Sequence, residues 1–93
     1  MAAMDLLGRR WALRILWELG RQPRGARELL SQCEGLSSSV LYDRLRELAD
    51  VGLVVRQDTS GYALSATGRQ LADAIAPLDA WAEAWAAQLA RGS

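Results

Sequence analysis

The sequence of 93 residues has no histidine, no lysine and a single cysteine, Cys33. Without histidine, neither serine–histidine nor cysteine–histidine catalysis can be assembled, and a cysteine–histidine zinc site is excluded. A single cysteine also excludes an intramolecular disulfide. No carboxylate pair or glycine-rich phosphate loop stands out, so we expect no enzyme, no cofactor and no metal.

Long apolar runs are missing as well. No run approaches the roughly 18 residues of a membrane span, and the first five residues lack the basic region and cleavage site of a signal peptide. Because 51% of the residues are hydrophobic, intrinsic disorder is excluded. We therefore expect a single domain over residues 1–93, located in the cytoplasm and without a membrane partner.

Positive charge comes from arginine alone and is unevenly distributed. Eleven arginines balance eleven acidic residues, so the net charge is zero, which argues mildly against a nucleic-acid ligand. Residues 1–56, however, hold nine arginines against seven acidic residues, whereas residues 57–93 hold two against four. The first part of the chain is therefore mildly basic and the last part mildly acidic.

Apolar residues at helical spacing predict a mainly helical chain. The expected helices cover residues 5–7, 9–19, 25–34, 37–50 and 66–93. Gly20 is expected to end the second of these helices, and the serine before the fourth is a favourable N-cap. Pro77 lies inside the last helix and should bend it or split it in two.

A short hairpin is predicted between the last two helices. Residues 53–57 and 62–64 have strand character, and Asp58-Thr59-Ser60-Gly61 between them has turn chemistry. Two short helices joined by a glycine-containing turn and followed at once by a hairpin are the order of a winged helix-turn-helix. The expected fold is therefore mainly α with a small β-hairpin and a long C-terminal helix.

The helix at residues 37–50 is the candidate recognition helix. A rotation of 100° per residue places its leucines on one face and its polar side chains on the other. Arginine can donate two hydrogen bonds to guanine, and serine and tyrosine hydroxyls can contact phosphates or base edges. The candidate DNA contacts here are Ser37, Ser38, Ser39, Tyr42 and Arg46. An ordinary amphipathic helix explains the same pattern, but the hairpin that follows favours DNA.

Three segments, residues 6–19, 36–54 and 62–68, together resemble one known family, the HxlR-type winged-helix transcriptional regulators. Residues 6–19 are similar to its opening, L-L-G-G-K-W-x-L-x-I-L-x-E-L, and residues 36–54 to its I-S-x-x-x-L-x-x-R-L-R-E-L-x-x-x-G-L-V. Residues 62–68 resemble its Y-x-L-T-x-x-G. The resemblance implies DNA contacts from the helix that starts at Ser37 and from the hairpin, and Arg10 stands where the family has lysine.

The sequence also departs from this family's pattern. The family's hairpin is longer and has a P-P-R tip. The turn here has no basic residue, and Arg56 is the only basic residue of the hairpin. The expected DNA side of the molecule carries Arg10, Arg24, Arg27, Arg46 and Arg56. Whether the shortened wing contacts DNA stays open at this stage.

Four tryptophans are an unusually high number for this length. Packing in the core or in a dimer is one explanation, and an aromatic ligand pocket formed by Trp11, Trp17, Trp81 and Trp85 is the other. Beyond Pro77 the apolar positions continue past what a small core can cover, so we expect a homodimer. Its expected interface is formed by Leu6, Leu7, Leu78, Trp81, Trp85 and Leu89.

Two further residues have simple interpretations. Cys33 is expected to be a small buried hydrophobe rather than a redox sensor, and Arg44 is expected to form a surface ion pair rather than to contact DNA.

Three functions are consistent with these observations. The first is a sequence-specific, dimeric DNA-binding regulator that represses transcription, with an aromatic effector as a further partner. The second is a winged-helix protein that binds a hydrophobic aromatic molecule through its tryptophans, with DNA binding reduced or lost. The third is a protein–protein adaptor that uses the same helices.

Overall fold

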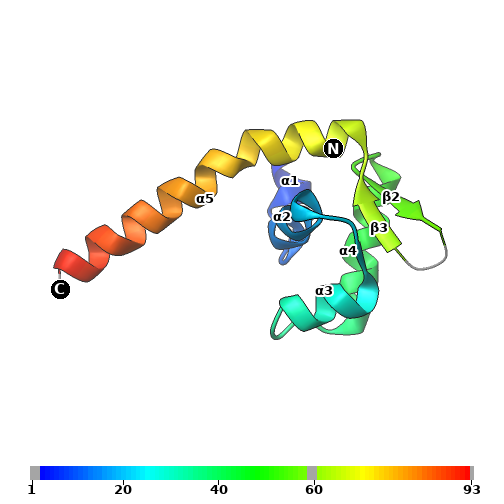
Figure 1. Ribbon diagram of the computed structural model, residues 1–93, viewed down its shortest axis with the longest axis horizontal. Helices are drawn as coiled ribbons and strands as arrows, with labels where there is room; N and C mark the ends of the chain where they lie inside the picture. Colours follow the sequence, from blue (N-terminus) through cyan, green and yellow to red (C-terminus); the bar gives the residue numbers. More distant parts are fainter. Residues whose placement is uncertain (1–2, 59–60, 93) are drawn as a thin grey trace.

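The computed structural model describes residues 3–58 and 61–92. Its elements are α1 (Ala3–Leu7), α2 (Ala12–Arg21), β1 (Arg24–Gly25), α3 (Ala26–Gln32), α4 (Ser38–Asp50), β2 (Val54–Gln57), β3 (Gly61–Leu64) and α5 (Ala66–Gly92). Figure 1 shows α1 to β3 gathered into one body, from which α5 extends as a long arm toward the C-terminus. The predicted fold class, mainly helical with a small sheet and a long last helix, is confirmed.

Helix α2 extends two residues further than the sequence predicts. Gly20, the expected end, lies inside the helix, which closes at Arg21 with the Gln22 amide donating to the Glu18 carbonyl. A Cβ at Gly20 would lie 3.5 Å from the Cβ of Ala72 in α5, so this glycine faces a neighbouring helix. Pro23 rather than Gly20 therefore marks the end of α2.

Helix α4 begins and ends as its sequence predicts. The Oγ of Ser37 accepts a hydrogen bond from the Val40 amide at 3.3 Å, which is the N-cap arrangement. At the other end Gly52 adopts a φ of 79°, a left-handed conformation that strains residues with a Cβ. These two local signals give the helix its full length of 13 residues.

The sheet has three antiparallel strands in the order β1-β3-β2 rather than the two expected. Strand β1 is only two residues long, with Arg24 opposite Tyr62 and Gly25 opposite Gly61. Strands β2 and β3 pair from Val54–Leu64 to Gln57–Gly61, which makes the predicted hairpin. The predicted turn residues Thr59 and Ser60 lie outside the described residues.

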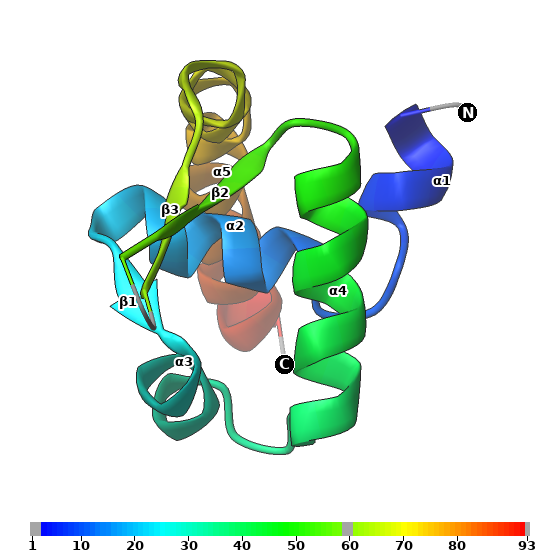
Figure 2. The same cartoon turned by 90° about the vertical axis from the view of Figure 1, so that its right-hand side faces the viewer.

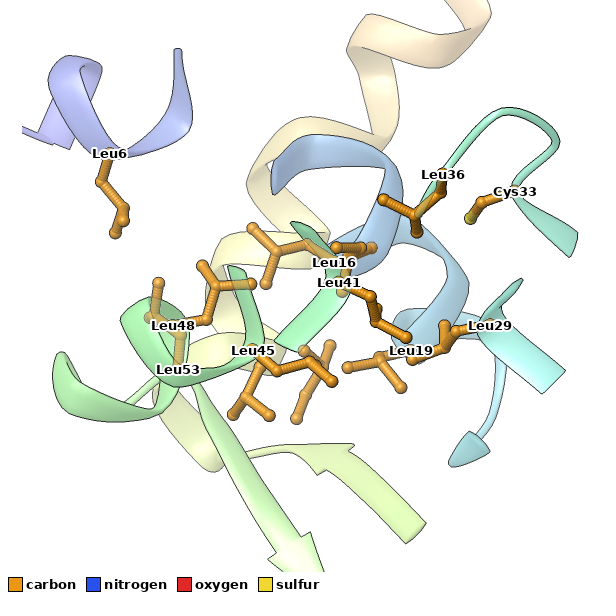
Figure 3. Close-up of a cluster of buried hydrophobic side chains, with 13 residues drawn as sticks. Leu6, Leu16, Leu19, Leu29, Cys33, Leu36, Leu41, Leu45, Leu48 and Leu53 are labelled. Atoms are coloured by element: carbon orange, nitrogen blue, oxygen red, sulfur yellow. The ribbon is translucent and has the colours of Figure 1, made fainter. Parts of the chain in front are cut away.

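One hydrophobic core joins the helices to the sheet. Figure 3 shows its leucines converging from α2, α3 and α4, with Leu53 completing the cluster beside the sheet. Leu41, Leu45 and Leu48 of α4 are buried, as the helical spacing predicts. The residues of α5 that pack against this core are Leu71, Ala72 and Ile75, all in its first half.

Helix α5 starts at a well-defined cap and continues through its proline. The Oγ of Ser65 accepts a hydrogen bond from the Gly68 amide at 3.0 Å, so Ser65 is the N-cap. Pro77 does not split the helix, which is continuous from Ala66 to Gly92, although Figure 1 shows that its direction changes gently along its length.

We expect Gly68→Ala to destabilise the fold, because a Cβ at this position would overlap the carbonyl oxygen of Leu53. That carbonyl is held by the Ser65 amide at 3.0 Å and cannot easily move. Overpacking of this kind costs about 1–3 kcal/mol, whereas glycine to alanine in an open helical position is stabilising. Urea unfolding should show the loss, and Gly92→Ala, with open space around its Cβ position, is the control. Equal midpoints for both variants would contradict the close contact.

Candidate nucleic-acid interface

The N-terminus of α4 presents three exposed serines. Ser37 caps the helix, its hydroxyl lies 3.3 Å from that of Ser39, and Ser38 lies between them. The first amides of a helix lack partners within the helix and favour an anion, so hydroxyls and amides here suit a phosphate group. The structure therefore brings together the three serines that the sequence singled out.

The outward face of α4 carries the next two candidates. The side chain of Tyr42 is 47% exposed, and Arg46 lies one turn further along on the same side. Arg46 forms an ion pair with Asp43 at 3.2 Å, and both side chains are well exposed. Because exposed pairs of this kind contribute little free energy, a base edge or phosphate can displace Asp43 from Arg46.

Arg44 points away from this face, as expected. Its Nη1 lies 3.2 Å from a carboxylate oxygen of Glu47, and its Nε donates to the carbonyl of Arg10 at 2.8 Å. These contacts join the middle of α4 to the connection between α1 and α2. Arg44 is thus a packing residue of the helix.

A groove runs between α4 and the hairpin. Its wider part, about 620 Å³, extends to residues 25–28 at the start of α3, and a second part of about 250 Å³ continues along Leu45, Arg46 and Ala49 of α4. The side chains that line both parts are Tyr42, Arg56 and Tyr62. Figure 2 shows α4 on one side of this space and the sheet on the other. We call it the α4–hairpin groove.

Arg56 and Tyr62 form one unit within the groove. They are opposite each other in the β2–β3 register, and the guanidinium carbon of Arg56 lies 5.9 Å from the centre of the Tyr62 ring. Arg27 is exposed at the wider end of the same groove. Two of the five arginines expected on the DNA side therefore line the wider part, and Arg46 lines the narrower part.

Arg24, which was also expected on the DNA side, is buried instead. Its Nε lies 3.4 Å from a carboxylate oxygen of Glu18, and Glu18 is completely buried. Arg24 therefore anchors β1 to α2 and cannot contact a ligand. The expectation from its sequence position was wrong because a buried carboxylate captures its charge.

Glu18 holds a second arginine on its other oxygen. Arg14 approaches Oε2 at 2.8 Å with its Nη2, and the same nitrogen donates to the carbonyl of Gln32 at 2.8 Å. Glu18 thus connects α2 both to the end of α3 and to β1, which precedes α3. The helix-turn-helix unit is fixed at both ends of its first helix by one carboxylate.

Arg10 lies apart from the α4–hairpin groove. It is exposed in the connection between α1 and α2, with its guanidinium 5.8 Å from the centre of the Trp11 ring. The shallow pocket around it is lined by residues 7–11 and by residues 13 and 14. The structure therefore does not bring Arg10 together with the other candidate DNA contacts.

The tryptophans do not form one pocket within the chain. Trp17 lines a groove of about 380 Å³ between α2 and α5, together with Leu13, Arg14, Ile75, Leu78, Asp79 and Ala82. Trp11 lines the pocket beside Arg10. Trp81 and Trp85 stack on each other further along α5, with ring centres 5.3 Å apart.

The candidate dimer surface is divided between exposed and buried residues. Leu6 is only 8% exposed and belongs to the core of the same chain. Its expected place in the dimer interface is therefore wrong, because its side chain is already buried. Leu7 packs partly against that core. The α5 residues of the set, Leu78, Trp81, Trp85 and Leu89, are all at least half exposed.

Cys33 is a buried core residue, as predicted. It lies within the hydrophobic cluster, and burial raises the pKa of its thiol above the usual range, although the charge of nearby Arg14 partly opposes this. A protonated, inaccessible thiol is a poor nucleophile. The structure gives this cysteine a packing role.

Sequence reasoning missed Glu18 and Tyr62. Glu18 follows Ile15 by three residues and precedes Leu19, so an acidic residue interrupts the apolar face of α2. Such an interruption signals a buried ion pair. Tyr62 lies two residues before the buried Leu64 on β3, so the two side chains lie on the same side of the sheet. This spacing indicates that Tyr62 faces the groove.

Together, a three-stranded wing, a helix pair whose second helix exposes a polar face, and a long last helix define a winged helix-turn-helix transcriptional regulator. The family model of the HxlR-like helix-turn-helix matches residues 6–90, so the chain belongs to this family. Among the residues that the structure describes, no helix combines the length and apolar character needed to cross a membrane.

Similar proteins agree with this assignment. The uncharacterized HTH-type transcriptional regulator YvaP of Bacillus subtilis is 30% identical over 89 residues, with 89% of this chain and 82% of YvaP covered. A structure described as a possible HxlR family transcriptional factor from Thermoplasma volcanium has a TM-score of 0.86 and 27% identity, covering 91% of this chain and 82% of that one. Quinone-bound YodB from B. subtilis has a TM-score of 0.78 and 32% identity, covering 87% and 90%.

Glu18→Gln should strongly destabilise the protein, because it removes the buried counter-charge of Arg24 and leaves only the exposed Glu28, 4.0 Å away. Removal of one partner from a buried ion pair costs about 3–5 kcal/mol. Chemical denaturation followed by circular dichroism measures this loss, with the exposed Glu83→Gln as the matched control. If the two variants unfold at the same denaturant concentration, Glu18 is not the anchor that the geometry indicates.

Proposed function

We propose that this regulator binds a specific DNA sequence as a homodimer, inserts α4 into the major groove and represses transcription. The observation that carries the proposal is the face of α4 on which three serines, Tyr42 and Arg46 are exposed side by side. An α-helix fits the major groove of B-DNA, where each base pair shows a distinct pattern of donors and acceptors. A small dimer bound across a promoter can repress by occupying it.

The residues of this face have different tasks in the proposal. The serines at the start of α4 bind a phosphate and set the position of the helix on the duplex. Arg46 donates to a guanine edge deeper in the groove, and Tyr42 contacts the same strand with its hydroxyl. Phosphate contacts would supply affinity, and the Arg46 contact would supply sequence preference.

Homodimerisation through α5 is supported by the exposed apolar stripe of Leu78, Trp81, Trp85 and Leu89. Side chains of this size bury large areas, and a contiguous apolar patch on a small protein marks an interaction surface. A two-fold axis through this stripe pairs the same surface of two copies. The two α4 helices would then contact half-sites about 34 Å apart, or a multiple of this distance.

Arg46→Gln should weaken binding to the specific duplex by about 1–3 kcal/mol and reduce the preference over a scrambled duplex. The upstream region of the protein's own gene provides the first duplexes, and fluorescence anisotropy gives the affinity. Arg91→Gln, an arginine at the far end of α5, is the control. A variant that discriminates the two duplexes as well as the wild type removes Arg46 from base recognition.

Trp85→Arg should produce monomers and weaken operator binding at the same time, because a charge then replaces an apolar side chain in the proposed interface. Ala87→Arg adds the same charge on the opposite side of α5, where we expect no effect. Light scattering at tens of micromolar protein measures the mass of each variant. A monomeric wild type, or a dimeric Trp85→Arg variant, contradicts an interface on α5.

An aromatic effector is a second candidate function, favoured by the groove between α2 and α5. Trp17 forms one wall, and the guanidinium groups of Arg14 and Arg21 lie 5.5 and 5.1 Å from the centre of its ring. The relative YodB was crystallised with a quinone bound, which makes a planar ligand a reasonable class here.

We expect 2-naphthoate, a planar carboxylate, to bind saturably in calorimetric titrations, because its ring can stack on Trp17 beside two arginines. Trp17→Leu should abolish this binding, and Trp11→Leu should leave it intact since Trp11 lines another pocket. No binding at millimolar concentration, or equal binding by both variants, contradicts an effector site in this groove.

A further inference from the structure

The hairpin has no basic residue at its turn, and its polar side chains Arg56 and Tyr62 line the groove beside the helices. Side chains alternate along a strand, so Val54 and Arg56 share one side of β2, and Leu64 and Tyr62 share one side of β3. Val54 and Leu64 lie opposite each other and are buried in the core. Arg56 and Tyr62 also lie opposite each other. Arg56 and Tyr62 therefore continue the inner side of the sheet beyond the apolar core, into the α4–hairpin groove.

Tyr62 is held firmly enough to orient its neighbour. It lies on β3, the central strand, with Arg24 opposite it on β1 and Arg56 opposite it on β2. Arg24 in turn is anchored by the buried Glu18. The face of an aromatic ring attracts a guanidinium group, so Tyr62 holds the exposed Arg56 over its ring, at the groove.

The opposite wall of the groove supplies a matching group. Tyr42 of α4 lines both parts of the groove together with Arg56 and Tyr62, so α4 adds a second phenol side chain to the groove. The acidic side chain that lines the groove, Glu28, is turned to the chain itself: its Oε1 accepts from the Gly25 amide at 3.2 Å and its Oε2 lies 4.0 Å from Arg24. The groove is therefore suited to a single anionic group.

When a recognition helix lies in the major groove, the DNA backbone that borders that groove passes between the helix and the wing. We propose that the α4–hairpin groove binds one phosphate of this backbone through Arg56 and the hydroxyl of Tyr42. Tyr62 is the positioning residue that holds Arg56 in place. The wing thus acts through the strands at its base, and its short turn needs no arginine. This inference rests on the proposed binding of DNA by α4.

Two consequences distinguish this arrangement from base recognition and from simple packing. A phosphate contact acts on every DNA sequence equally and releases counterions, so its loss lowers the salt slope of binding by about 0.9 for each phosphate. A residue that acts only through Arg56 has no further effect once Arg56 is removed.

The test measures fluorescence anisotropy of specific and scrambled duplexes with the full chain at several salt concentrations. Arg56→Gln and Tyr62→Leu should weaken binding to both duplexes by the same factor and lower the salt slope, whereas Tyr62→Phe, which keeps the ring, should retain the slope of the wild type. The double variant Arg56→Gln/Tyr62→Leu should bind no more weakly than Arg56→Gln alone. Arg91→Gln serves as the control for loss of one arginine, and circular dichroism verifies that each variant is folded.

Several results would contradict this inference and leave the proposed function intact. Loss confined to the specific duplex would make Arg56 a base contact, and additive losses in the double variant would show that Tyr62 acts independently of Arg56. Unchanged binding by Arg56→Gln, with Arg46→Gln still impaired, would remove the hairpin from the interface. If the wild type binds neither duplex, the proposed function itself fails. If Tyr62→Leu unfolds, Tyr62→Phe and Arg56→Gln still decide between these outcomes.

Discussion

The helix-turn-helix half of this protein depends on the buried carboxylate of Glu18. One oxygen binds Arg14, which also donates to the carbonyl of Gln32 at the end of α3, and the other lies beside Arg24 in β1. A buried charge is tolerated only with partners, so these contacts form together. Helix α2 thereby fixes both ends of α3 and the strand that pairs with β3. Glu18 thus holds in place the start of α3, which lines the wider part of the α4–hairpin groove.

The rest of the molecule reflects how little core a chain of this size can build. A domain of 93 residues buries a modest share of its surface, and the leucines of α2, α3 and α4 are mostly used within it. Only the first half of α5 contributes to that core, so the apolar side chains beyond Pro77 extend into solvent. A second copy covering them would add the buried area that one chain lacks, which connects stability to the two-fold symmetry of DNA recognition.

The sequence predicts those elements whose signals are local. The leucine spacing of α4, the Ser37 cap and the glycine at position 52 are all local signals, and the structure confirms the helix that they indicate. Strand β1 could not be predicted, because two residues carry no periodicity and their partner β3 lies far along the sequence. Arg24 was misplaced for the same reason: its partner is set by tertiary packing. The groove could not be predicted from local signals either, since Tyr42 and Tyr62 line the same space only in the folded chain.

The central claim is that DNA lies along α4 and the inner side of the hairpin. The most direct measurement is a titration of the isotope-labelled protein with its operator duplex, followed through the backbone amide resonances. We predict that the largest shifts fall on the N-terminal turns of α4 and on β2 around Arg56, while those of α5 beyond Pro77 change little. Shifts confined to the groove between α2 and α5, with α4 unaffected at saturating DNA, would contradict the account.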